Sequence, residues 1–218
     1  MFYIVQNKLQ NEHKTMSKQQ DLAKNIINIY QKHGRDWTHL RGEFLYEQAW
    51  LDAFLAVIPQ SSKILDLGCG SGKPIAQYFI KQNYQLTGVD SSEQMLEMAE
   101  QSFPEQRWIL HDMRKLALNE TFAGILAWDS FFHLTPDDQR AMFQIFQDHA
   151  DEDAALLFSS GPAAGEAIGE LFGEALYHAS LSAEEYTRLL NQHGFEVVKM
   201  IAEDPNCAGH TVWLARKI

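Results

Sequence analysis

Short apolar runs alternate along the chain with longer stretches in which apolar residues recur at helical spacing. A short apolar run bounded by turn residues is typical of a buried strand, and helical spacing of apolar residues is typical of a helix packed on a sheet. Strands that alternate with helices predict an α/β fold with a mostly parallel sheet. The predicted strands are 63–67, 84–90, 107–110, 122–128, 154–160, 195–201 and 210–217.

Two helices are predicted before the first strand. One covers 17–33, where Gly34 ends the apolar pattern, and the other covers 43–57 and stops before a proline. Residues 1–16 are polar beyond the first five, so we expect little order there, and an alternative translation start at Met16 stays open. The expected organisation is a tail at 1–16 and one domain at 17–218, made of an N-terminal helical cap at 17–60 and a core at 61–218.

The stretch 161–180 differs from the rest of the core. Glycines recur at every fourth position in its first half, and a capping box then starts a predicted helix at 182–193. We expect the stretch to be irregular. It is either an insertion that carries Glu166, Tyr177 and His178 to a cleft or a surface loop.

The first strand of the core runs into a glycine-rich loop at 68–72, which is followed by a helical pattern. Glycine has no Cβ, so such a loop can bring backbone N–H groups close to a ligand. A dinucleotide fingerprint fails because Lys73 stands where its third glycine is needed, and a phosphate-binding P-loop fails because Pro74 replaces its Ser or Thr. What remains is an acidic residue, Asp66, followed by glycines at alternate positions.

The pattern Asp66-x-Gly-x-Gly-x-Gly72 resembles motif I of the class I S-adenosylmethionine-dependent methyltransferases. Gly88-Val-Asp-Ser-Ser resembles the second motif of that family, and Asp129-Ser-Phe-Phe-His-Leu134 resembles the fourth. The resemblance extends from about residue 20 to the end of the chain. It implies a Rossmann-like, seven-stranded, mostly parallel sheet with an antiparallel last strand, helices on both faces and an N-terminal helical cap. It also implies S-adenosylmethionine as the cofactor.

The resemblance implies a role for each matching residue. Asp66 helps to place the ammonium group of the cofactor, and Asp90 stands where a carboxylate can accept hydrogen bonds from both ribose hydroxyls. Asp112 matches an Asp that accepts from the adenine amino group, with Met95 and Met113 on either side of the ring. Simpler readings stay open: Asp90 as a helix cap, Asp112 as a turn residue, and the two methionines as core residues. The expected cofactor-binding residues are Tyr30, Trp37, Arg41, Asp66, Gly68, Cys69, Gly70, Asp90, Ser91, Met95, Asp112, Met113 and Trp128.

The end of the fourth strand is the expected place of the chemistry, because ligands of parallel α/β sheets bind at the carboxyl ends of the strands. We therefore expect Asp129 and His133 to be the catalytic residues, beside Trp128. A general base is needed only if the acceptor arrives protonated. Asp129, His133, His178 and His210 are the available groups, and the sequence does not rank them. No metal site is expected, because the chain has neither H-x-x-x-H nor C-x-x-C.

Composition limits the partners. The formal net charge is −11 and no Lys/Arg cluster occurs, so we expect neither a nucleic acid nor a membrane as the partner. No apolar run is long enough for a transmembrane helix, and the N-terminus lacks the features of a signal peptide. With only two cysteines, a cytoplasmic location is the simplest expectation.

The function expected from all of this is methyl transfer from S-adenosylmethionine to a small-molecule acceptor by in-line displacement. Two alternatives from other classes stay open. One is a non-catalytic protein that binds the cofactor or a partner with the same fold, and the other is an oxidoreductase that binds NAD at the glycine loop. Binding of S-adenosylmethionine rather than NAD would distinguish the methyltransferase from the oxidoreductase. Transfer of a labelled methyl group would distinguish it from the non-catalytic binding protein.

Overall fold

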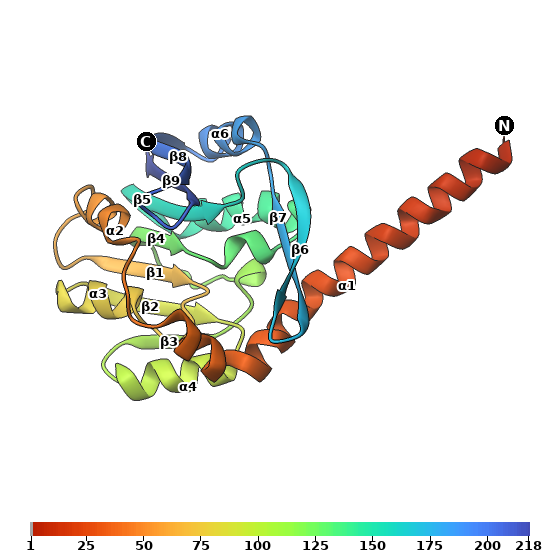
Figure 1. The fold of residues 1–218 in the computed structure, drawn as a ribbon. Helices are drawn as coiled ribbons and strands as arrows, with labels where there is room; N and C mark the ends of the chain where they lie inside the picture. Colours follow the sequence, from red (N-terminus) through yellow and green to blue (C-terminus); the bar gives the residue numbers. More distant parts are fainter. Residues whose placement is uncertain (1) are drawn as a thin grey trace.

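The computed structural model describes the backbone of residues 2–218 and the side chains of residues 19–218. Its centre is a seven-stranded sheet in the order β3-β2-β1-β4-β5-β9-β8 (Figure 1). Strands β1 to β5 pair in parallel, and β9 pairs antiparallel with both β5 and β8, as predicted. The strands are β1 (Lys63–Leu67), β2 (Gln85–Asp90), β3 (Arg107–Leu110), β4 (Phe122–Ala127), β5 (Ala150–Ser160), β6 (Gly165–Leu171), β7 (Glu174–Ser180), β8 (Phe195–Asp204) and β9 (His210–Lys217).

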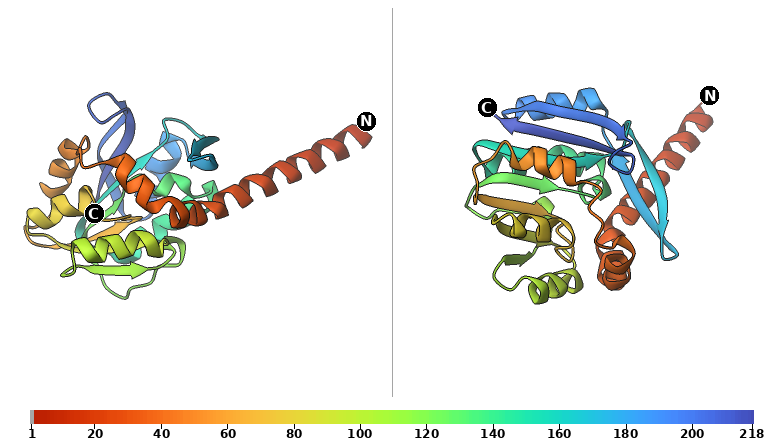
Figure 2. Two further views of the ribbon diagram at one scale, coloured as in Figure 1. Left: turned by 60° about the horizontal axis from the view of Figure 1, so that its bottom comes forward. Right: turned by 60° about the vertical axis from the view of Figure 1, so that its left-hand side comes forward.

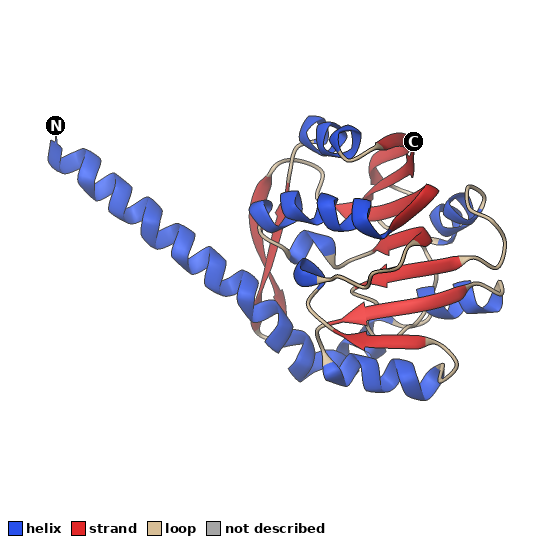
Figure 3. Ribbon diagram, turned by 180° about the vertical axis from the view of Figure 1, so that it is seen from behind, coloured by secondary structure: helices blue, strands red, loops and turns tan. Residues whose placement is uncertain are grey.

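Helices cover both faces of the sheet (Figures 2 and 3). Successive residues of a strand point to opposite faces, so Ile64 of β1 packs with α2 and α3, and Leu65 packs with α5 and α6. Strand β4 is buried along its whole length, as expected for a central strand. The helices are α1 (Phe2–Arg41), α2 (Gln48–Leu55), α3 (Ile75–Lys81), α4 (Glu93–Ser102), α5 (Pro136–His149) and α6 (Ala183–Gln192).

Helix α1 does not end at Gly34, so that boundary prediction is wrong. The helix continues to Arg41 and ends at Gly42, whose φ of 63° and N–H bond to Thr38 O are typical of a left-handed C-cap. Gly34 instead marks the crossing of α1 and α4, where an added Cβ would lie 3.0 Å from Oε1 of Gln94. The stretch 1–16, expected to have little order, is helical backbone from residue 2, and its side chains lie outside the described residues.

The stretch 161–180 is not irregular, which corrects a second prediction. Strands β6 and β7 form a two-stranded antiparallel ribbon beside α1 (Figure 1). Strand β6 is exposed from Gly165 to Glu170, so it lacks the alternation of apolar residues that marks a strand in sequence. Its turn has positive φ at Phe172 and Gly173, and Phe is not a residue that predicts such a turn.

The close packing of α2 on β4 leads to a testable prediction. A Cβ at Gly124 would lie 2.5 Å from the Cζ atom of buried Phe54. Overpacking of this kind costs about 1–3 kcal/mol, which exceeds the roughly 0.5–1 kcal/mol that Gly→Ala otherwise gains in a strand. We expect Gly124→Ala to lower the free energy of unfolding, measured by urea titration. An unchanged midpoint would show that the two elements are not in this contact.

Within residues 2–218, none of the helices combines the length and the apolarity that crossing a bilayer requires.

Candidate functional site

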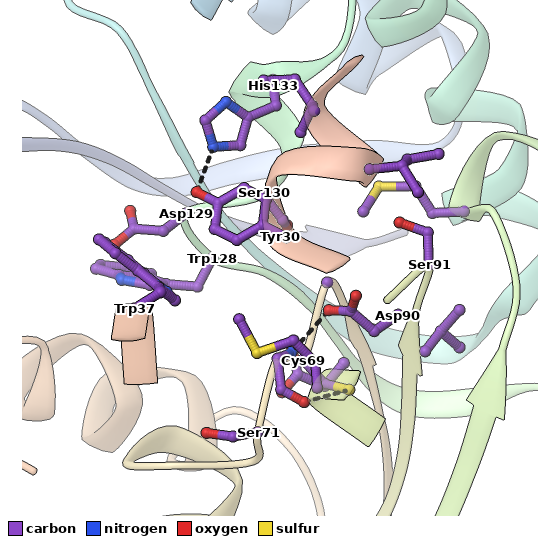
Figure 4. A pocket seen from close by; sticks show the side chains of 18 of the residues that line it. Tyr30, Trp37, Cys69, Ser71, Asp90, Ser91, Trp128, Asp129, Ser130 and His133 are labelled. Atoms are coloured by element: carbon purple, nitrogen blue, oxygen red, sulfur yellow. Dashed lines mark hydrogen bonds between the residues drawn. The ribbon is translucent and has the colours of Figure 1, made fainter. Parts of the chain in front are cut away.

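One cleft lies at the carboxyl ends of β1, β2 and β4 (Figure 4). Helix α1 runs past these strand ends (Figure 1) and contributes to the lining of the cleft. Every residue that the sequence predicts for cofactor binding or catalysis lines this cleft. Sequence reasoning missed the apolar side chains that α1 adds, Ala23, Ile26 and Ile27, and the polar residues Arg114 and Ser130. The helical spacing of apolar residues in the first helix could have indicated the apolar set, although such spacing more often marks core packing.

The glycine loop has the geometry that requires glycine. Gly68 and Gly70 have φ of 80° and 54°, a region that residues with a Cβ rarely adopt. A Cβ at Gly68 would also lie 2.2 Å from Cβ of Ser130, so the loop after β1 touches the loop after β4. The loop is tied to β2, because Gly68 N–H donates to Val89 O at 2.7 Å.

Asp90 links the glycine loop to the start of α4. Its Oδ2 accepts from Gly70 N–H at 2.9 Å and its Oδ1 accepts from Ser92 N–H at 2.8 Å. Burial raises the pKa of Asp90, and these hydrogen bonds oppose that shift. The helix cap is Ser92, whose hydroxyl accepts from Met95 N–H, so Asp90 is not the cap that the simpler reading suggested.

Asp66 is the second carboxylate of this region, and it is only 3% exposed. Burial and the charge of Asp90 raise its pKa to about 7. Among the described residues it has no side-chain hydrogen-bond partner, which leaves its carboxylate for a ligand. The same two carboxylates and burial raise the pKa of the Cys69 thiol well above its usual range, so this thiol is protonated at neutral pH.

Asp112 begins a short 3₁₀ helix (Met113–Lys115) and is paired with Arg114. The Arg114 guanidinium donates from Nε to Oδ1 at 2.9 Å and from Nη2 to Oδ2 at 2.6 Å, which helps to lower the pKa of Asp112 against its partial burial. Asp112 is therefore ionised and held in the cleft wall. Both methionines lie near the glycine loop, because a Cβ at Gly70 would lie 3.9 Å from Met95 Sδ and a Cβ at Gly68 would lie 3.3 Å from Met113 Cε.

Helix α1 contributes Tyr30 and Trp37 to the cleft, with their rings edge to face (Figure 4). The Tyr30 hydroxyl lies 3.0 Å from Nε2 of His133. On its other side His133 places Nδ1 2.8 Å from Tyr177 O, and a carbonyl requires a donor, so Nδ1 carries the hydrogen and Nε2 accepts from Tyr30. Burial lowers the pKa of His133 to about 4. Both ring nitrogens are thus engaged, and His133 is neutral.

Asp129 sits at the end of β4 with φ of 48°, a left-handed conformation that Asp tolerates better than most residues. Its backbone N–H donates to Ser159 Oγ at 2.9 Å. Its carboxylate accepts from the Tyr46 hydroxyl at 3.2 Å and lies 3.0 Å from Nε2 of His210. Arg41 also lines the cleft, and its guanidinium forms an ion pair with the buried carboxylate of Glu47.

Among the described residues, no group of three or more His, Cys, Asp or Glu side chains is arranged to hold a metal ion.

Residues 64–152 match a family model described as a methyltransferase domain. A protein of Bacillus subtilis (strain 168) called YqeM is 34% identical over 91 residues, which are 40% of this chain and 36% of YqeM. The O-methyltransferase cnsE of Penicillium expansum is 28% identical over 149 residues, 64% of this chain and 54% of cnsE. The chain thus spans between about a third and about half of the length of these two relatives.

Solved structures share the fold. The magnesium protoporphyrin IX methyltransferase ChlM from Synechocystis PCC 6803, with bound SAM, superposes with a TM-score of 0.69 at 17% identity, covering 90% of this chain and 97% of ChlM. The 1,6-didemethyltoxoflavin-N1-methyltransferase of Burkholderia thailandensis gives a TM-score of 0.65 at 20% identity, covering 94% and 89%. With the match of residues 64–152 to a methyltransferase domain, this shared fold confirms the resemblance to the class I S-adenosylmethionine-dependent methyltransferases that the motifs indicated.

Proposed function

We propose that this protein transfers the methyl group of S-adenosylmethionine to a small-molecule acceptor by in-line displacement. The observation that carries the proposal is the single cleft in which Asp66, Asp90 and the glycine loop meet Asp129. Relatives support the reaction class, since cnsE is an O-methyltransferase and ChlM was solved with SAM bound.

The residues of the cleft fit the cofactor. Asp66 has a buried carboxylate without a side-chain partner among the described residues, which suits the ammonium group. Asp90 keeps lone pairs for the ribose hydroxyls beside the two backbone bonds that it accepts. Asp112, Met95 and Met113 would surround the adenine ring. When bound, the cofactor supplies an electrophilic methyl carbon, and the residues of this chain orient it.

The acceptor would lie where Tyr30, Trp37 and Trp128 surround Asp129. These aromatic side chains favour a small, partly apolar molecule with a polar group for Asp129. Neither an acceptor with a polyanionic backbone nor a membrane fits a chain with a net charge of −11. We also propose that residues 17–60 act as a cap on a core formed by 61–218.

The alternatives are less well supported. The Asp129 carboxylate is held by three side chains, those of Tyr46, Ser159 and His210. A non-catalytic binding protein would not need a carboxylate held in this way at the proposed acceptor site. An NAD-dependent enzyme does not explain the match of residues 64–152 to a methyltransferase domain.

Transfer of a labelled methyl group tests the proposal. Wild-type protein incubated with methyl-labelled S-adenosylmethionine and the small-molecule fraction of a cell extract is expected to yield a labelled product. A folded Asp90→Ala variant serves as the negative control. Label that appears only in macromolecules, or nowhere, would contradict the proposed acceptor class.

Asp66 leads to a prediction about pH. Its pKa of about 7 means that the free protein must release a proton before the carboxylate can pair with an ammonium group. The affinity for S-adenosylmethionine is therefore expected to be constant just above pH 7. Below pH 7 the affinity is expected to fall, and the fall approaches about tenfold per pH unit. Calorimetric titrations over a pH series measure this. Asp66→Asn is expected to bind weakly and to lose the dependence, and an identical pH profile in both proteins would contradict the assignment.

A further inference from the structure

His210 lies next to Asp129, although the two residues belong to distant parts of the sequence. The cause is the register of the sheet. Strand β9 runs antiparallel to β5, with Thr211 opposite Ser160, so β9 begins where β5 ends. The first residue of β9 therefore lies at the carboxyl edge of the parallel strands. The turn before it is held to α2, because Trp50 Nε1 donates to Asp204 at 2.9 Å.

Both ring nitrogens of His210 face acceptors. Nδ1 lies 2.9 Å from Cys207 O, and a carbonyl oxygen can only accept. Nε2 lies 3.0 Å from Oδ1 of Asp129, and a carboxylate oxygen accepts. Both nitrogens must therefore carry hydrogen, which makes His210 an imidazolium paired with the Asp129 carboxylate.

The surroundings of His210 suit a cation. The imidazole ring stacks with Tyr46, at 5.2 Å between centroids, and with Trp128, at 5.5 Å. Cations are stabilised over the faces of aromatic rings. The charged groups that act on His210 are Asp129 at the end of β4 and Glu47 before α2, and Glu47 is paired with Arg41. Asp129 and Glu47 raise the pKa of His210, against the effect of its burial.

We propose that His210 is a positioning residue, which as an imidazolium holds the Asp129 carboxylate aimed at the O–H or N–H of an uncharged acceptor. This inference rests on the proposed methyl transfer. His210 is not among the described residues that line the cleft, but it contacts two that are, Trp128 and Asp129. The Asp129 carboxylate is held by His210 and by the hydroxyl groups of Tyr46 and Ser159, and in this inference it orients the acceptor rather than removing its proton.

The pairing has a consequence for pH. As pH rises through the raised pKa of His210, the ring loses one hydrogen and can no longer donate to both Cys207 and Asp129. Asp129 is then held less firmly, so methyl transfer falls on the alkaline side. His210→Gln can still donate one hydrogen bond but cannot titrate. It is expected to retain affinity for S-adenosylmethionine, to transfer methyl groups about tenfold more slowly, and to lose the alkaline fall.

Two measurements test this inference. The first is NMR of the histidine ring nitrogens in the free protein, which requires neither cofactor nor acceptor. His210 is expected to be doubly protonated at neutral pH, and its pKa to drop in Asp129→Asn. A singly protonated ring, or a pKa that does not change in Asp129→Asn, would overturn the inference.

The second measurement is labelled methyl transfer to the small-molecule extract over a pH series, for wild type, His210→Gln and the matched control His39→Gln at an exposed position. An alkaline fall in wild type and His39→Gln, absent from His210→Gln, supports the positioning role. The same fall in all three proteins overturns it. If wild type yields no labelled product at all, the proposed function fails, and the NMR result alone decides on the ion pair.

Discussion

Replacement of Asp90 by Ala is expected to weaken the binding of S-adenosylmethionine by about 1–3 kcal/mol, or roughly 5- to 150-fold in Kd. The carboxylate is the proposed partner of the ribose hydroxyls, and it also accepts from the N–H groups of Gly70 and Ser92. The variant therefore loses a ligand partner and the restraint that ties the glycine loop to α4. Calorimetric titration of the purified variant measures the change.

The matched control for this variant is Asp148→Ala, because Asp148 is exposed on α5 and does not line the cleft. It is expected to bind like wild type. Thermal unfolding checks that both variants are folded. Wild-type affinity in a folded Asp90→Ala protein would sink the assignment of Asp90 to the ribose.

Asp129→Asn is expected to slow methyl transfer by about 10- to 150-fold, the range for losing a hydrogen bond to a charged group. Asn is the suitable replacement because it tolerates the left-handed backbone of this position, φ 48°, as Asp does. Its amide cannot form the ion pair with His210, so the acceptor loses the carboxylate that His210 positions. Affinity for S-adenosylmethionine should be unchanged, since the proposed cofactor contacts are made by other residues.

The rate and the affinity are measured together for this variant, by labelled transfer and by calorimetry. Asp148→Asn provides the matched control at an exposed position. Normal transfer by a folded Asp129→Asn protein would remove Asp129 from the chemistry. A loss of cofactor affinity equal to the loss of rate would instead make Asp129 a cofactor-binding residue.

The parallel core was predictable because its strands are short, apolar and bounded by turn residues, as Phe122–Ala127 shows by being buried throughout. The cleft residues were predictable for a related reason. In a parallel sheet the carboxyl ends of the strands meet at one edge. Residues at or just after these ends, such as Asp90 and Asp129, can therefore be expected to come together without any knowledge of side-chain packing.

The remaining features depend on tertiary contacts. Gly34 reads as a helix end in sequence, and only the crossing with α4 explains a glycine inside α1. The pairing of His210 with Asp129 follows from the register of β9 on β5, which no local pattern reveals. The sequence suggested His133 as a candidate base, whereas both of its ring nitrogens are engaged in hydrogen bonds, one with the Tyr30 hydroxyl and one with Tyr177 O. Its catalytic role stays a prediction, and the geometry favours a structural task.

The most direct test of the central proposal is calorimetric titration of the purified protein with S-adenosylmethionine and, separately, with S-adenosylhomocysteine. Binding of both at micromolar concentration is the predicted result, and it would leave the identity of the acceptor as the next question. A folded sample that binds neither compound would contradict the proposed function and would favour a protein that keeps the methyltransferase fold without its chemistry.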